Sequence, residues 1–139
     1  MANALFGLAK ESLLSQSPSI DLDTDNLLVS LVRGYTVNLA THQFLSDVTG
    51  GGGGTIVATS GNLAGKTVAL GVFDATDVTY VAVGAGAACE TLVIYKDTGV
   101  AATSPLIAYI DSATNLPVTP NGGDILITWD AGANKIFAL

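Results

Sequence analysis

The chain has 139 residues, of which 49% are hydrophobic and only 12% are charged, with a formal net charge of −7 at pH 7. Its length predicts one domain with a sizeable core, and its few Lys and Arg residues argue against nucleic acid or an anionic membrane as the main partner. Because so few charges protect a free monomer poorly against association, we expect partner chains to cover part of the surface.

An N-terminal helix is predicted over residues 4–15, with Asn3 as its cap. Leu5, Leu8 and Leu13 fall at helical spacing and form one apolar stripe. The stripe packs either on the sheet of its own domain or on a neighbouring subunit, and the sequence leaves both interpretations open. These three leucines are therefore candidate interface residues.

Alternating acids follow the helix and suggest a calcium loop, with Asp21, Asp23 and Asp25 two residues apart. A calcium loop of this type needs glycine at its sixth position and glutamate at its twelfth, where this chain has Asn26 and Val32. We therefore expect the solvated start of a strand over residues 27–32 and no metal site. A second extended piece at 35–39 and a helical turn at 42–46, capped by Thr41, are predicted next.

Five consecutive glycines occupy residues 50–54. Such a run has high backbone freedom and offers no side chains for packing. It predicts either a flexible exposed loop or a place where the backbone of another chain comes close. Gly50, Gly52 and Gly54 are candidate interface residues on the second interpretation.

Two segments resemble nucleotide-binding loops without meeting their requirements. Residues 60–67 end in Gly-Lys-Thr, but the first glycine of the phosphate loop is replaced by Ser60, and residues 67–73 read as a strand where a helix is needed. Residues 62–65 therefore predict a turn between strands. Residues 84–88 lack the third glycine of a dinucleotide loop and precede a strand.

The chain offers little for catalysis, with His42 and Cys89 as its only histidine and cysteine. No nucleophile–base set or cluster of metal ligands is visible, so we predict no enzyme, no catalytic, cofactor-binding or metal residues, and no cofactor. No apolar run is long enough to span a membrane, and no basic segment precedes a long apolar core. We expect no membrane partner and synthesis in a cytoplasm.

The centre of the chain predicts a buried hairpin, because residues 92–95 and 106–110 are short apolar runs rich in β-branched and aromatic side chains. Residues 124–129 and 135–139 predict a C-terminal hairpin, with Trp129 as a core anchor and Phe137 and Leu139 as candidate interface residues. Together these segments predict one mainly β domain over residues 1–139. It is an antiparallel β-sandwich or barrel of about eight strands over residues 20–139, preceded by one α-helix within residues 1–15.

Several segments resemble a family of small proteins encoded among the head genes of tailed bacteriophages and prophages. They are MANAL at 1–5, YTVNLATH at 35–42, LVIYKDTG at 92–99, LIAYID at 106–111, LPVTPNGGD at 116–124, and the closing residues 129–137. The five-glycine run is where this chain departs from that pattern.

The resemblance implies a virion structural protein, and we expect a cement or decoration protein on the outer capsid surface, with the major capsid protein as its partner. A head–tail connector or tail component is the alternative. Decoration proteins commonly occupy threefold positions, and open strand edges favour a closed ring. We therefore predict a homotrimer in which the helix or the 50–54 loop reaches a neighbour.

Overall fold

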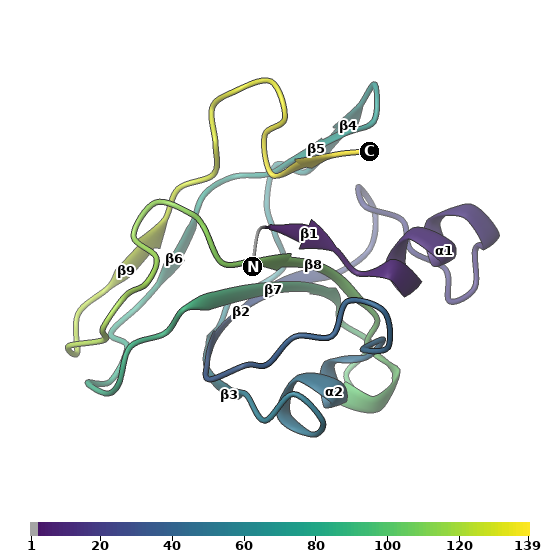
Figure 1. Ribbon diagram of the computed structural model, residues 1–139. Coiled ribbons are helices and arrows are strands. Elements are labelled where there is room, and N and C mark those ends of the chain that lie inside the picture. The colour runs from purple at the N-terminus through teal and green to yellow at the C-terminus, as the bar shows by residue number, and fades with distance from the viewer. Residues whose placement is uncertain (1–2) are drawn as a thin grey trace.

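Figure 1 shows the computed structural model of the chain, which describes residues 3–139. Its largest sheet has five antiparallel strands in the order β1–β8–β7–β2–β3. In that order the strands are Ala4–Leu5, Leu106–Ile110, Thr91–Lys96, Leu27–Arg33 and Thr55–Thr59. β7 and β8 lie near the middle of the sheet and every residue of β8 is buried, so the predicted central hairpin is confirmed.

Two smaller antiparallel sheets complete the β structure. One has the order β10–β5–β4 and the other pairs β6 with β9. These strands are Phe137–Ala138, Val72–Asp74 and Thr67–Ala69 in the first sheet, and Val78–Tyr80 and Ile125–Ile127 in the second. The mainly β, antiparallel fold is confirmed, with ten strands in the described chain rather than about eight. The sheets stay open, so the sandwich is the arrangement observed.

One hydrophobic core joins the sheets. The side chains of Ile94 and Ile107 from the large sheet, Phe73 from β5 and Ile127 from β9 are all completely buried. Burial of an aliphatic or aromatic side chain of this size contributes about 1.5–3 kcal/mol, so residues from all three sheets stabilise one another. Trp129 is also buried, as its predicted role as a core anchor requires.

The N-terminal helix begins later than predicted. Ala4–Leu5 forms β1 on the edge of β8, and α1 runs over Gly7–Ser15. Asn3 does not cap the helix: its Oδ1 accepts hydrogen bonds from the backbone N–H groups of Asp111 and Ser112, each at 2.9 Å, and its Nδ2 donates to the Ser112 carbonyl at 2.8 Å. The unpaired edge of β8 overrides the local preference of these residues for helix.

The second helix is also displaced from its predicted position. The turn expected at 42–46 is replaced by α2, Leu45–Thr49, and Asp47 rather than Thr41 organises its start. The Asp47 carboxylate accepts hydrogen bonds from the backbone N–H groups of Gln43 and Phe44. A short 3₁₀ turn, Ala101–Thr103, lies in the loop between β7 and β8, and residues 35–39 form no strand.

Two predictions about strands are wrong. Residues 67–73 do not form one strand, because they belong to the hairpin of β4 and β5, whose strands are joined by the two-residue turn Leu70-Gly71. The hairpin ends at Asp74, and we call it the 67–73 hairpin. β9 and β10 do not pair with each other, because β9 joins β6 and β10 joins β5. The chain end is consequently carried next to the 67–73 hairpin, on the side of the molecule where β1 and α1 lie (Figure 1).

Candidate functional site

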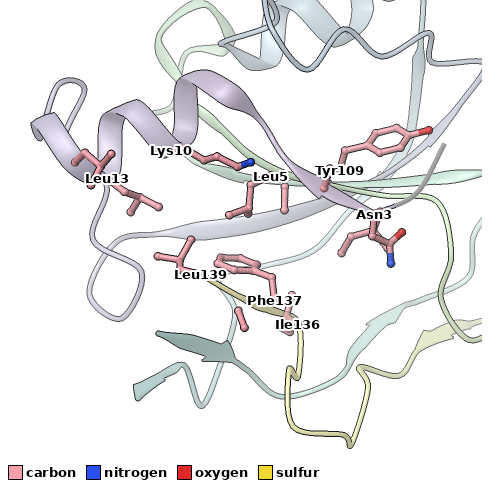
Figure 2. A pocket seen from close by; sticks show the side chains of 13 residues that line it. Asn3, Leu5, Lys10, Leu13, Tyr109, Ile136, Phe137 and Leu139 are labelled. Atoms are coloured by element: carbon pink, nitrogen blue, oxygen red, sulfur yellow. The ribbon is translucent and has the colours of Figure 1, made fainter. Parts of the chain in front are cut away.

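An apolar groove with a volume of about 600 Å³ lies between the two ends of the described chain. We call it the terminal groove. Figure 2 shows β1 and α1 on one side and β10 on the other, with Leu5 facing Phe137 and Leu139 across it. Its lining consists of Asn3, Ala4, Leu5, Lys10, Leu13, Leu14, Ala108, Tyr109, Ile110, Ile136, Phe137, Ala138 and Leu139.

Both walls of the terminal groove are edge strands. β1 pairs only with β8 and β10 pairs only with β5, so each strand has one side without a strand partner in the described structure. An open strand edge presents unpaired backbone donors and acceptors to any chain that approaches it. The site therefore combines apolar side chains with backbone groups that could accept another polypeptide.

The lining of the terminal groove contains a single charged side chain. It is Lys10, whose ammonium group forms no ion pair or side-chain hydrogen bond with residues 3–139. The polar atoms of Asn3 are already used by residues 111–112. The groove thus suits the burial of apolar surface with one acidic contact.

Exposed apolar side chains continue from the terminal groove onto its surroundings. Leu14 is 89% exposed and Leu139 70% exposed, while Leu70, at the tip of the 67–73 hairpin, is fully exposed. The Leu139 carbonyl oxygen lies 3.6 Å from the position that a Cβ on Gly71 would occupy, so the hairpin borders the groove. A continuous apolar surface of this kind is typical of a protein–protein contact.

The structure brings four of the predicted interface residues together and separates the rest. Leu5, Leu13, Phe137 and Leu139 all line the terminal groove, whereas Leu8 does not. Their role in an interface stays a prediction. The sequence missed Leu70, because residues 67–73 were interpreted as one strand. Gly71, between two strand-forming runs, was the signal for the turn.

The glycine run lies at the opposite edge of the large sheet. It leads into β3, the edge strand farthest from β1 in the strand order. Gly52 and Gly54 are buried against Tyr35, and a Cβ on Gly52 would lie 2.3 Å from the Tyr35 ring. The interpretation as a flexible exposed loop is therefore wrong for these two residues. A side chain of the same chain, Tyr35, is what comes close to the backbone of Gly52 and Gly54, and a contact with another chain stays a prediction. Gly50 is exposed.

The acidic residues at 21–25 are engaged within the chain. The Asp25 carboxylate forms an ion pair with Lys96 at 3.0 Å and accepts the backbone N–H of Asp21. A hydrogen bond between the Asp21 and Asp23 carboxyls lowers the pKa of Asp21 and raises that of Asp23. Among residues 3–139, no group of three His, Cys, Asp or Glu side chains is placed to hold a metal ion.

The segment resembling a phosphate loop also has an internal role. A turn at 62–65 leads into β4 and not into a helix. The Lys66 ammonium group donates hydrogen bonds to the Asp25 carbonyl at 2.6 Å and to the Asn62 side chain at 2.8 Å. This lysine fastens the turn to the start of the large sheet, which accounts for its position without a phosphate.

His42 and Cys89 both sit in structural environments. The Tyr35 hydroxyl lies 2.8 Å from Nδ1 of His42, and the Asn38 backbone N–H donates to the same nitrogen. Cys89 is buried, and burial raises the pKa of its thiol. His42 and Cys89 interact with different residues and share no partner in the described chain.

Comparison with known proteins identifies no family, because neither a family model nor a curated protein sequence matches the chain. Within residues 3–139, no helix has both the length and the apolar character needed to cross a bilayer. The surface around the terminal groove is the structural feature that bears on function.

Proposed function

We propose that this protein is a structural component of a bacteriophage virion, a cement or decoration protein that binds the major capsid protein on the outside of the assembled capsid. The observation that carries the proposal is the apolar surface formed by the terminal groove and the exposed tip of the 67–73 hairpin. A surface of this kind suits binding to other protein chains, and the head-gene resemblance of the sequence supplies the kind of assembly.

The charge of the protein supports an outer position. A net charge of −7 would repel packaged DNA, and the surface has few basic side chains with which to contact phosphate. On the outside of the shell the acidic surface faces solvent. A protein that binds the assembled shell more tightly than the free subunits stabilises the shell by mass action.

The experiment compares particles that contain the protein with particles from a clean deletion. We expect the deleted particles to release DNA at a lower temperature and under milder osmotic shock, and purified protein to restore the difference when added back. The readouts are DNA release on heating and co-sedimentation of the protein with emptied capsids. Identical release in both particle types, together with no co-sedimentation, would refute the proposal.

A head–tail connector or tail component is the second candidate, and the two open edges that line the terminal groove suit ring formation. The number of copies in a purified particle separates the candidates. A cement protein covers the whole shell and is present in many copies, whereas a connector occupies one vertex and is present in few. A few copies located at one vertex would favour the connector.

A further inference from the structure

The tip of the 67–73 hairpin carries the side chain of Leu70, which does not contribute to packing within its own chain. Leu70 and Gly71 form a two-residue turn with φ of 52° and 78°, the left-handed region in which asparagine or glycine is usual at the first position. Leu70 is fully exposed and packs against nothing in the described chain. A large apolar residue in an unfavourable backbone conformation, without packing, points to a contact outside this chain.

The terminal groove offers the apolar packing partners that Leu70 lacks in its own chain. It is bordered by the same hairpin, but the hairpin cannot fold back into it, because β4, β5 and the groove wall β10 belong to one sheet with fixed pairing. The apolar tip and the apolar groove therefore lie side by side on one chain, but the tip cannot pack into the groove of its own chain. It can pack only into the groove of a second copy.

The charges at the two surfaces are complementary. Lys10 has the one charged side chain of the terminal groove and forms no ion pair or side-chain hydrogen bond within residues 3–139. Asp74, the last residue of β5 in the hairpin, likewise has no side-chain partner there. A hairpin inserted into the groove of another copy brings a carboxylate toward a free ammonium group.

We propose that the 67–73 hairpin of one copy docks in the terminal groove of a second copy, with Leu70 as the apolar anchor. The contact joins two different surfaces, so a pair of bound copies still offers one free groove on the first copy and one free hairpin on the second, and repetition closes a ring when the geometry allows. This self-association is independent of the capsid: it concerns how copies of the chain bind one another, whatever else they bind.

The first test measures self-association of the purified protein by sedimentation velocity over a range of concentrations. The substitution Leu70→Asn introduces a residue that tolerates the left-handed turn and removes the apolar anchor. We expect its association constant to fall by about 10- to 100-fold, with a thermal midpoint of the monomer equal to or above that of the parent. The matched control is Val81→Asn, because Val81 is 75% exposed but lies in neither surface, and association should not change.

The second test separates tip-to-groove docking from tip-to-tip docking. A groove variant, Leu14→Gln with Leu139→Gln, alters two lining residues that the fold itself leaves exposed. Each defective variant alone should be monomeric at concentrations where the parent associates. A mixture of the groove variant with Leu70→Asn should form a one-to-one dimer, because one intact hairpin and one intact groove remain. A mixture that stays monomeric would overturn the proposal.

Salt provides a further readout, because each copy carries a net charge of −7 and the copies repel one another. Apolar docking should therefore strengthen as salt screens this repulsion. Parent protein that is monomeric at every concentration and salt level, or Leu70→Asn that associates like the parent, would refute the inference. If the parent is monomeric but still binds capsids, only this inference fails. If it associates but neither binds nor stabilises capsids, only the proposed function fails.

Discussion

Replacement of Gly52 by alanine tests how tightly the glycine run is packed. A Cβ at this position would lie 2.3 Å from Cε2 and 2.5 Å from Cδ2 of Tyr35, and 3.0 Å from the Val48 carbonyl oxygen. The Gly52 backbone cannot easily retreat, because its N–H donates to the Asp47 carbonyl and its carbonyl accepts the N–H of Thr36, at 2.8 and 2.9 Å.

The Tyr35 ring is also restrained against movement away from Gly52. Its hydroxyl is hydrogen-bonded to Nδ1 of His42 at 2.8 Å, and its ring stacks on His42 with a centroid distance of 5.6 Å. On its other side it meets the edge of Tyr109 at 6.0 Å. Relief of the overlap with a new methyl group therefore requires several groups to move together.

Insertion of one methylene-sized group into a well-packed site typically destabilises a protein by about 1–3 kcal/mol, and we expect Gly52→Ala to lie at the upper end, about 3 kcal/mol. For a domain of this size, each kcal/mol lowers the thermal midpoint by roughly 3 °C, so the midpoint should fall by about 10 °C. Calorimetry supplies the midpoint, and urea unfolding supplies the free energy of unfolding.

Gly51→Ala is the matched control for this prediction. A Cβ on Gly51 would lie 3.6 Å from Nε2 of His42, which is an ordinary van der Waals contact. The substitution also restricts the unfolded chain, so we expect a change within about 1 kcal/mol, in the stabilising direction. Equal midpoints for the two alanine variants would show that the loop yields freely and that the packing argument is wrong.

Three further predictions concern the buried Cys89 thiol, two buried tyrosines and the exposed side chain of Asn3. Because burial raises the pKa of the Cys89 thiol, iodoacetamide should not label the native protein at mildly alkaline pH but should label it in urea; rapid native labelling would contradict this. Burial raises the pKa of Tyr35 and Tyr80 well above the ordinary value of about 10, so the free energy of unfolding should be insensitive to these groups below that pH and fall above it, as the unfolded chain ionises first. Phenolate absorbance that develops at these residues without unfolding would count against this. Asn3→Ala removes three hydrogen bonds to residues 111–112 and should lower the free energy of unfolding by about 1–2 kcal/mol in urea titrations, whereas no change would mean that water replaces them fully.

The sequence predicted the elements whose partners lie close in the chain or whose two faces are both apolar. The runs at 92–95 and 106–110 were identified because β-branched and aromatic residues fill both faces, and they were expected to pair as neighbours in the chain despite a long loop. The run Thr-Ile-Val-Ala-Thr at 55–59 is likewise typical of a strand, and β3 has these bounds, Thr55–Thr59. In these segments the local signal and the tertiary environment agree.

The pairing of the C-terminal strands could not be derived in the same way. Strand propensity identified the runs around Ile125 and Phe137, but propensity does not specify a partner. The partners, β6 and β5, lie far earlier in the chain, and the segment between β9 and β10 runs from one small sheet to the other. Ala4 and Leu5 were assigned to a helix for a related reason, because the edge of β8 that recruits them is remote in sequence.

For the candidate site, the sequence identified the apolar residues but not their arrangement. Leu5, Leu13, Phe137 and Leu139 stood out as apolar residues near the ends of the chain, but the groove that they share depends on the pairing of β10 with β5. The burial of Gly52 was not predicted, because no residue near it in the sequence indicates that Tyr35 covers it.

The pairing of the terminal strands also determines when the terminal groove exists during protein synthesis. Ala4 pairs with Tyr109, and Phe137 pairs with Phe73. A nascent chain whose 67–73 hairpin has just emerged from the ribosome therefore has neither wall of the groove in place, since β8 and β10 have yet to leave the ribosome. If the hairpin docks in the groove of another copy as proposed, chains growing on the same messenger RNA cannot associate through this contact until β8 and β10 have emerged.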